Sequence, residues 1–290
     1  MKFAVVAHRA SETNRALASA RPPGVNGFLA TPQAALGALA PGDIALGRLD
    51  VRSSLDGMEE GSAELNHLAA HGVGVLNPPS ALLAAHDKLL TARLLRLAGL
   101  PHPRTTVLGN GRLPFPLVLK PRFGSWGRDV TLCRDEVELG LRLSELADRP
   151  WLQDGAILQE LVPTKGHDLR LVVAGGRVVG AARRLAAHGE WRTNVALGGR
   201  SAAVIPPPVA CALAEEAAAA IGADLVGVDL LPDGGGDWTI LELNGAVDFK
   251  PRYSLVEDVY AAAVRALIAA PPRLPYPRRI RIAEPGATRP

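Results

Sequence analysis

The stretch from Leu225 to Asn244 constrains the fold more than any other part of this sequence. It contains two apolar runs, Leu-Val-Gly-Val-Asp-Leu-Leu and Trp-Thr-Ile-Leu-Glu-Leu-Asn, on either side of the turn-forming cluster Pro-Asp-Gly-Gly-Gly-Asp. Two apolar runs around a Gly-rich turn indicate a β-hairpin. The other expected elements of the chain are interpreted around this hairpin.

The register of the hairpin decides which side chains share a face. If Leu231 lies opposite Trp238, strand alternation puts Asp229, Glu242 and Asn244 together on one face. The residues expected on the other face, against a core, are Val228, Leu230, Leu241 and Leu243. Two carboxylates and an amide oxygen form an all-oxygen site of the kind that binds Mg²⁺ together with water and phosphate. The alternative is a solvated hairpin face that carries two acids by chance.

Composition favours a soluble globular protein with two or three lobes. The 290 residues are enough for a sizeable core, and 48% of them are hydrophobic while 21% are charged. A net charge of +3 does not make a polybasic surface, so we expect no nucleic-acid partner. Cys133 and Cys211 lie far apart without a metal-like spacing, which favours a reducing compartment. Because no signal peptide or membrane-length apolar run is found, we expect a cytoplasmic location and no membrane partner.

The first 78 residues predict a small parallel α/β lobe. The expected elements are strands at 3–7, 42–48 and 73–76 and helices at 14–20 and 59–70. No Gly-x-Gly-x-x-Gly follows the first strand, so a dinucleotide site is not predicted. Arg48, Asp50 and Arg52 come directly after the second strand, where ligands bind in open α/β sheets. An ordinary surface loop is the alternative for each of these three residues.

Lysine and glycine residues mark the middle of the chain. One helix is expected from Ser80 to Leu97 with Lys88 in its middle, and a lone helical lysine is normally solvated. A strand at 117–120 ends in Lys120 and runs into a Gly-rich loop. The loop consists of Gly124, Ser125, Trp126 and Gly127. Such a turn lets backbone N–H groups approach phosphate oxygens, although it does not match a P-loop and is a weak signal alone.

A hairpin rich in arginine follows. Further expected elements are a helix at 136–147, a strand at 156–162, a hairpin over 171–182, and helices at 206–221 and 257–269. Four arginines lie within about one strand-turn-strand unit: Arg183, Arg184, Arg192 and Arg200. This density suits phosphate and carboxylate ligands better than a solvated face. Residues 271–290 form a Pro- and Arg-rich tail for which poor order is expected.

Taken in order, these residues resemble the ATP-grasp superfamily of carboxylate–amine ligases. The resemblance covers about residues 80–262 and is closest to the branch with the ribosomal-protein glutamate ligase (RimK-like) and the aminoadipate carrier-protein ligase of lysine biosynthesis (LysX-like). The matching segments are His86-Asp-Lys88, Val118-Leu-Lys-Pro121, Gly124-Ser-Trp-Gly-Arg128, Gln159-Glu160, Gly166-His-Asp-Leu-Arg170, Arg192-Thr-Asn194, Gly227-Val-Asp229 and Glu242-Leu-Asn244. The segment Gly-Ser-Trp-Gly favours the LysX-like branch.

The resemblance implies an α/β (α+β) ATP-grasp fold. A small parallel α/β domain is expected over residues 1–78, followed by two α+β lobes that clasp ATP. The first of these lobes, with the Gly-rich loop, covers 79–162, and the second, with the metal-binding hairpin, covers 163–270. Residues 271–290 are expected to be a flexible tail.

The resemblance also implies a binding site for ATP. Two lysines and the Gly-rich loop contact the phosphates, and these residues are Lys88, Lys120, Gly124, Ser125, Trp126 and Gly127. One strand lines the adenine pocket, and its residues are Gln159, Glu160, Leu161 and Val162. Two acids, Glu160 and Asp168, lie near the adenosine.

The metal ligands and the reaction centre follow from the same resemblance. Two Mg²⁺ ions, with Mn²⁺ as the alternative, are held by Asp229, Glu242 and Asn244. The residues that face the γ-phosphate and the acceptor carboxylate are Arg170, Arg192 and Asn194. Surface ion pairing, with Glu190 or Asp168 as the partner, is the alternative for the two arginines.

The implied activity is ATP-dependent amide formation between an amino acid and a carboxylate, through an acyl phosphate, with release of ADP and phosphate. The expected carboxylate is a Glu-like C terminus of a protein or peptide, including that of a small carrier protein, and the expected assembly is a homodimer or homotetramer. After Asn244 the chain reads Gly-Ala-Val-Asp-Phe-Lys, which differs from both the RimK-like and the LysX-like branch. The substrate of neither branch can therefore be assigned directly to this chain. An ATP-grasp kinase or a small-metabolite ligase is the alternative. The complete metal set argues against a third class, a nucleotide-binding regulatory protein without turnover.

Overall fold

The N-terminal part of the protein forms a parallel sheet covered by helices. The computed structural model describes residues 1–153, 155–163, 165–233 and 236–270, so the predicted tail and part of the hairpin turn lie outside the described residues. The elements of this part are β1 (Lys2–Val6), α1 (Glu12–Ser19), β2 (Asn26–Ala30), α2 (Pro32–Ala38), β3 (Ile44–Gly47), α3 (Ser62–Ala70) and β4 (Gly74–Leu76). The strand order is β2-β1-β3-β4, and all pairs are parallel.

Strand β2 and helix α2 were not predicted from the sequence. The apolar run of β2 is only three residues long, Phe28-Leu29-Ala30, and it follows Asn26-Gly27, a pair typical of turns. Helix α2 has clearer signals, because Thr31 accepts a hydrogen bond from the Ala34 N–H and Pro32 occupies the first turn. The parallel α/β lobe therefore contains one more β-α unit than expected.

A small antiparallel sheet follows. Its elements are β5 (Thr105–Val107), β6 (Leu117–Lys120), β7 (Thr131–Cys133), α6 (Glu136–Glu145), α7 (Pro150–Gln153) and β8 (Ile157–Glu160). The strand order is β5-β8-β6-β7. Val51 and Leu55, from the loop after β3, are buried in the same hydrophobic cluster as Leu117 and Trp151. The N-terminal lobe is thereby packed against the small sheet.

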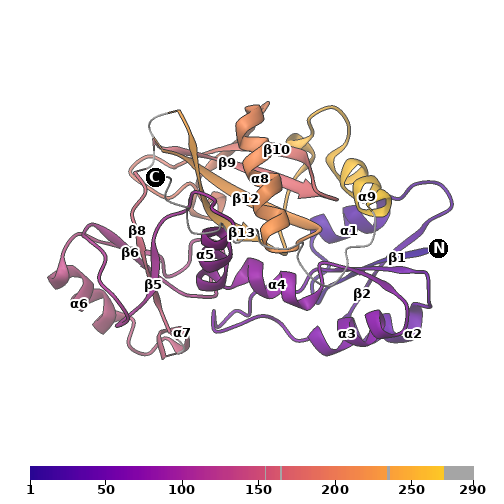
Figure 1. Ribbon diagram of the computed structural model, residues 1–290, viewed down its shortest axis with the longest axis horizontal. Helices are drawn as coiled ribbons and strands as arrows, with labels where there is room; N and C mark the ends of the chain where they lie inside the picture. Colours follow the sequence, from indigo (N-terminus) through magenta and orange to yellow (C-terminus); the bar gives the residue numbers. More distant parts are fainter. Residues whose placement is uncertain (154, 164, 234–235, 271–290) are drawn as a thin grey trace, which may run out of the picture.

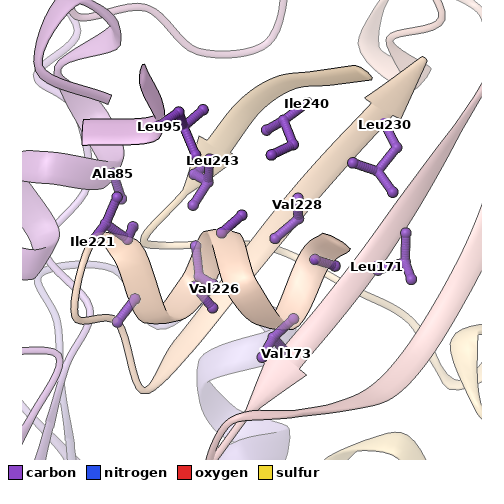
Figure 2. Packing of buried hydrophobic residues seen from close by; sticks show 14 of the residues in the cluster. Ala85, Leu95, Leu171, Val173, Ile221, Val226, Val228, Leu230, Ile240 and Leu243 are labelled. Atoms are coloured by element: carbon purple, nitrogen blue, oxygen red, sulfur yellow. The ribbon is translucent and has the colours of Figure 1, made fainter. Parts of the chain in front are cut away.

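The largest sheet in the described chain is five-stranded and antiparallel (Figure 1). Its elements are β9 (His167–Ala174), β10 (Arg177–Leu185), β11 (Arg200–Ala203), α8 (Pro208–Ala220), β12 (Leu225–Pro232), β13 (Trp238–Asn244) and α9 (Val259–Ala269). The strand order is β11-β10-β9-β12-β13. Helix α8 covers one face, where Leu171, Val173, Val226 and Val228 pack together (Figure 2). Helix α9 and the N-terminal sheet pack against the other face.

The hairpin register differs from the predicted one, although the predicted polar face forms. Trp238 pairs with Pro232 and not with Leu231. A bulge between Asp229 and Leu230 then restores the phase, so that Asp229 lies directly opposite Glu242. The bulge also turns Leu241 away from the core face, where we expected it. Ile240 is fully buried there in its place.

The single helix expected at 80–97 is two helices, α4 (Pro79–His86) and α5 (Lys88–Leu97). The break falls at Asp87, which leaves helical geometry and accepts hydrogen bonds from the N–H groups of Leu89 and Leu90. An aspartate in this role is a strong N-cap. Lys88 is therefore the first residue of α5 and not a mid-helix residue. Every helix in the described ranges is too short or too polar to span a membrane.

Asn77 joins the N-terminal sheet to the start of β12. It follows β4, is 1% exposed and has a φ of +49°. Its side-chain oxygen accepts the N–H groups of Asp224 (2.7 Å) and Leu225 (2.9 Å), and its Nδ2 donates to the Leu225 carbonyl (2.7 Å). The Asp224 carboxylate accepts the N–H of Asn77 at 2.8 Å.

We expect Asn77→Ala to lower the free energy of unfolding by about 2–5 kcal/mol, because it leaves three buried backbone groups unpaired. Alanine also tolerates a positive φ less well than asparagine. Urea unfolding followed by circular dichroism gives this quantity. The matched control is Asn26→Ala, at an exposed position of β2, for which we expect a change within about 0.5 kcal/mol. Equal stabilities of the two variants would contradict the prediction.

Candidate active site

A cleft lies between the small antiparallel sheet and the five-stranded sheet. It encloses about 750 Å³, open solvent included. The predicted site residues that line it are Lys88, Lys120, Gly124, Ser125, Trp126, Gly127, Gln159, Glu160, Leu161, Val162, Arg192, Asn194, Asp229 and Glu242. Three predicted residues are not part of the lining, namely Asp168, Arg170 and Asn244. The lining residues that received no role from the sequence are Val118, Val130, Arg184, Trp191, Thr193, Leu231 and Leu241.

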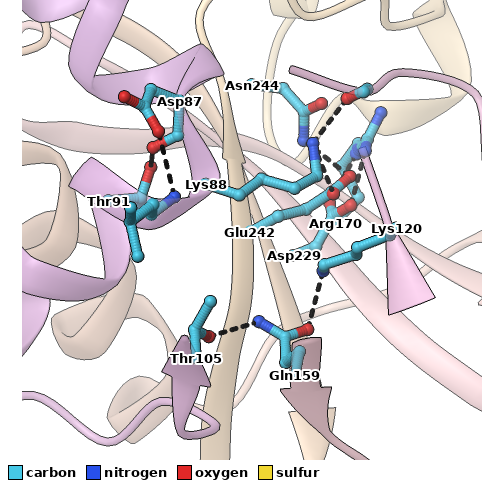
Figure 3. Close-up of polar contacts among 12 residues, drawn as sticks. Asp87, Lys88, Thr91, Thr105, Lys120, Gln159, Arg170, Asp229, Glu242 and Asn244 are labelled. Carbon is cyan, nitrogen blue, oxygen red and sulfur yellow. Dashed lines mark hydrogen bonds and ion pairs between the residues drawn. The ribbon is translucent and has the colours of Figure 1, made fainter. Parts of the chain in front are cut away.

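Lys88 reaches into the cleft from the start of α5 (Figure 3). Its ammonium group donates to the carbonyl oxygen of Gly124 in the Gly-rich loop. The same group lies 3.6 Å from the carboxylate of Glu242 on β13. The side chain is only 10% exposed, so it is not a solvated helical lysine. Lys88 thus stands between the loop and the hairpin.

Lys120 enters the cleft from the end of β6 and is 5% exposed. Its ammonium donates to the side-chain oxygen of Gln159 at 2.6 Å, and Gln159 in turn donates to the Thr105 hydroxyl at 2.9 Å. Burial and the nearby charge of Lys88 lower the pKa of Lys120 to about 7, against the opposing effect of Glu242. An anion that enters the cleft would favour the protonated form of this lysine.

The Gly-rich loop is anchored at its start. The Asp87 carboxylate accepts two hydrogen bonds from Arg122, one of them at 2.7 Å from Nε. Phe123 forms a β-bridge with Asp87, and the Lys88 N–H donates to the Arg122 carbonyl. Asp87 therefore caps α5 and fixes the loop with the same carboxylate, which explains why it directly precedes Lys88.

The tip of the loop has unusual backbone geometry. Trp126 has a φ of +64°, which is rare for a residue with a side chain, and it is 44% exposed on the rim of the cleft. Gly127 has a φ of +70°, and a Cβ placed on it would lie 2.9 Å from the Asn194 side-chain oxygen. At Gly124 the φ is not positive, and a Cβ there would have only ordinary contacts. Of the two glycines in this loop, Gly127 is therefore the one that requires glycine, both for its positive φ and for the close approach of Asn194.

Arg192 connects the segment before β11 to the Gly-rich loop. Its Nη1 donates to the carbonyl oxygens of Gly127 (3.1 Å) and Val130 (3.0 Å). Its Nε and Nη2 bind the Glu190 carboxylate at 3.0 and 2.8 Å, and these bonds lower the pKa of Glu190 to about 2. The predicted alternative, an ion pair with Glu190, is therefore present. Arg192 nevertheless lines the cleft, so the pair does not place it on the outer surface.

The hairpin brings the predicted metal ligands together. Glu242 lies opposite Asp229, and the Asn244 amide is 3.4 Å from Glu242. Both oxygens of Asp229 accept hydrogen bonds from Arg170 at 2.6 Å, and one also accepts from Arg184 at 2.8 Å. Burial opposes ionisation of Asp229, but the two arginines outweigh it and hold its pKa at about 2.

This donor set fits a hard divalent cation. Within the described residues, no group of three or more His, Cys, Asp and Glu side chains could hold a metal ion. The set has two carboxylates and one amide oxygen, which suits Mg²⁺ because this ion keeps water and phosphate in its shell. Glu242 and Asn244 are the more open members, since the oxygens of Asp229 already bind arginines.

Two predicted positions need correction. Asp168 is 0% exposed, its carboxylate accepts hydrogen bonds from Arg184 and from the Thr193 hydroxyl, and it is not part of the cleft lining. The reason is the strand register, which places Asp168 directly opposite Arg184. Arg170 was expected to face the cleft, but its guanidinium forms an ion pair with Asp229, and Arg170 is not part of the cleft lining. Glu160 does line the cleft, where it pairs with Arg104 at 3.2 Å.

Arg184 is the charged residue of the site that the sequence did not single out. It is one of the four clustered arginines, and nothing in their spacing separates it from the others. Its side chain is 5% exposed, and its position opposite Asp168 and diagonal to Asp229 follows only from the pairing of β10 with β9 and β9 with β12.

Known proteins resemble this chain over the same region. Residues 80–260 match the model of the family described as the RimK-like ATP-grasp domain. The tetrahydromethanopterin:alpha-L-glutamate ligase of Methanosarcina acetivorans is 32% identical over 182 residues, which cover 58% of this chain and 56% of that protein. The glutamate–LysW ligase ArgX of Sulfurisphaera tokodaii is 31% identical over 193 residues, which cover 63% of this chain and 68% of that protein. The first match thus spans little more than half of the relative's length.

A solved structure shares the fold. The ATP-grasp ligase PsnB, in complex with its minimal precursor, Mg and ADP, is 20% identical to this chain. The two structures have a TM-score of 0.65, with coverage of 92% of this chain and 97% of that one. This likeness confirms the predicted ATP-grasp fold. Because the family model matches more than half of the chain, including every residue that lines the cleft, the chain belongs to the RimK-like ATP-grasp family.

Proposed function

We propose that this chain is an ATP-dependent ligase that forms an amide bond between an amino acid and a carboxylate substrate. One observation carries the proposal: Lys88 bridges the Gly-rich loop and Glu242 at the end of a cleft that also contains the buried Lys120. Two lysines opposite two carboxylates suit phosphate groups and the cations that accompany them. The family match and the names of the relatives, which are glutamate ligases, support the same activity.

The proposed division of the chain follows its three sheets. An N-terminal α/β domain covers 1–78, the lobe with the Gly-rich loop covers 79–162, and the lobe with the hairpin covers 163–270. ATP lies between the last two, with its adenine against the strand from Gln159 to Val162. Its phosphates lie near Lys88, Lys120 and the loop. The cytoplasmic location and the assembly as a homodimer or homotetramer stay predictions.

The proposed reaction has two steps. A substrate carboxylate oxygen attacks the γ-phosphorus of ATP, which gives an acyl phosphate and ADP. The amine then attacks the acyl carbon, and phosphate leaves without a covalent enzyme intermediate. The Gly-rich loop excludes water from the acyl phosphate, and Arg192 and Asn194 lie at the rim to neutralise and orient the transferring group. Two Mg²⁺ ions held by Glu242, Asn244 and Asp229 would supply charge neutralisation on the phosphates.

The names of the relatives support a proposal for the substrate class. Their names describe glutamate ligases, one of which acts on the carrier protein LysW, so we propose glutamate or a similar acidic amino acid as the amine. The carboxylate is then a Glu-like C terminus of a peptide or carrier protein. A kinase or a small-metabolite ligase remains the second candidate. ADP release that requires both an amine and a carboxylate supports the ligase, whereas release with one acceptor alone supports the kinase.

We expect Glu242→Gln to lower ADP release by about 100-fold or more, because it keeps the volume of the side chain but removes an anionic ligand. Steady-state ADP release at saturating Mg²⁺, ATP and substrates measures the loss. Glu136→Gln, at an exposed position in the first turn of α6, is the matched control and should keep the wild-type rate. Near-normal activity of Glu242→Gln would show that the residue is not a metal ligand.

We expect Gly127→Val to impair turnover strongly, because valine resists a positive φ and would press on Asn194. Gly124→Ala is the comparison, since its φ is not positive and its Cβ would have ordinary contacts. The melting temperatures of both variants are measured as well, and for Gly127→Val we expect catalysis to be impaired more than thermal stability. The interpretation of the loop as a lid fails if both variants turn over ATP equally well.

Nucleotide binding should be linked to protonation of Lys120. The pKa of Lys120 is about 7, so at about pH 8 the free lysine is mostly neutral. The phosphates favour its charged form, and binding should therefore take up as much as about one proton and weaken as the pH rises above 7. Calorimetric titration of ADP in two buffers of different ionisation enthalpy counts the protons. Lys120→Arg stays charged and should abolish the uptake; equal uptake by both proteins would contradict the prediction.

A further inference from the structure

Arg48 is a buried cation at the ligand-binding edge of the N-terminal sheet. It directly follows β3, and the carboxyl edge of an open parallel sheet is where ligands bind. Arg48 is 2% exposed, whereas its neighbour Arg52 is exposed and forms a local ion pair with Asp56 at 2.9 Å. The structure thus separates two arginines that the sequence could not distinguish.

The hydrogen bonds of Arg48 leave part of its guanidinium without a partner. Nε donates to the Asn14 side-chain oxygen at 2.9 Å, and Nη2 donates to the Val247 carbonyl at 2.7 Å. Nη1 is buried and has no hydrogen-bond partner. The carboxylate paired with Arg48 is that of Asp248, but it lies 3.8 Å from Nη2, beyond hydrogen-bond distance, and its side chain is 37% exposed. Both acceptors are neutral, so a buried positive charge lacks a hydrogen-bonded anion.

Burial without a bound anion is unfavourable for a guanidinium. Burial lowers the pKa of Arg48, against the raising effects of Asp248 and Asp50. Arginine nevertheless stays protonated in proteins, so the group carries its charge in the interior. A buried charge is normally paired, because leaving it unpaired is strongly unfavourable. A bound carboxylate would supply the missing partner.

Two contacts connect Arg48 to segments that carry residues of the proposed site, although Arg48 itself is not among the residues that line the cleft. Val247 comes three residues after Asn244, in the loop that continues from the hairpin. The neighbour of Arg48, Leu49, accepts a hydrogen bond from the ring of His86 at 2.9 Å, and His86 comes two residues before Lys88. Arg48 is therefore linked to both sides of the phosphate end of the cleft.

We propose that Arg48 binds a carboxylate of a substrate, next to the group that reacts. The inference rests on the proposed ligase function and deepens it, because it assigns a residue that recognises the second carboxylate of an acidic substrate. The carboxylate belongs either to the acid that is activated or to the incoming amino acid. The planar guanidinium suits this ligand, because its N–H groups match the two oxygens of a carboxylate.

The test compares charged and neutral probes in the presence of Mg²⁺ and a non-hydrolysable ATP analogue. Calorimetry gives the affinities of L-glutamate, and of L-glutamine and L-isoglutamine, in each of which one carboxylate is a neutral amide. We expect the wild type to prefer glutamate over one of the amides by about tenfold or more. Arg48→Gln should abolish this preference. N-acetyl-L-glutamate, whose amine is blocked, distinguishes the two possible origins of the carboxylate. It can bind only in place of the acid that is activated and not in place of the incoming amino acid.

The matched control is Arg15→Gln, the same chemical change at an exposed position of α1, which should keep the preference. A purely structural Arg48 would weaken the charged and neutral probes equally, so an unchanged preference in Arg48→Gln overturns the proposal. A wild type without any preference overturns it as well. If Arg48→Gln does not fold, the same affinities are measured for Arg48→Lys. A preference for glutamate over the amide that is smaller than in the wild type supports binding by the planar guanidinium, and an unchanged preference contradicts it. Binding of the ATP analogue to the wild type tests the nucleotide site separately, so the two proposals can fail independently.

Discussion

The five-stranded sheet depends on a line of buried charges that crosses its strands. Arg184 on β10, Asp168 and Arg170 on β9, and Asp229 on β12 form three ion pairs in which every carboxylate oxygen accepts a hydrogen bond. Ion pairs in the interior contribute little net stability, but removing one partner leaves a buried charge uncompensated. Because each pair joins directly opposed or diagonal residues, a one-residue slip of any strand would separate charges from their partners. The line therefore fixes the registers of β10, β9 and β12, and with them the position of Asp229 in the sheet.

A second constraint connects this sheet to the nucleotide end of the cleft. Asp87 starts α5 by accepting hydrogen bonds from Leu89 and Leu90, and it also binds Arg122 before the Gly-rich loop. Lys88 follows at once and contacts both Gly124 and Glu242. One carboxylate thus orients the helix, the loop and the lysine together. This arrangement gives a physical reason for the adjacency of Asp87 and Lys88 that does not depend on family membership.

Much of the site could be predicted, and the exceptions have identifiable causes. The hairpin was evident from its two apolar runs, and the same face of Asp229 and Glu242 formed even though Trp238 pairs with Pro232, because a bulge corrected the phase. Asp168, which was predicted near the adenosine, is buried opposite its cross-strand partner Arg184 and does not line the cleft. The split of the helix at Asp87 was missed, since the apolar pattern on its two sides continues while only the capping side chain marks the break.

The sequence by itself determined the elements whose signals are local: apolar runs, turn residues, glycines and the lysine at the end of β6. Those signals reflect backbone and side-chain preferences that act within a few residues. Tertiary structure alone decided which of several similar arginines matter. Arg184 became part of the buried charge line, Arg48 became a cation without a hydrogen-bonded anion, and Arg52 stayed on the surface. The physical reason is that burial and pairing depend on contacts between segments far apart in the chain, such as Arg48 with Val247, which no local pattern encodes.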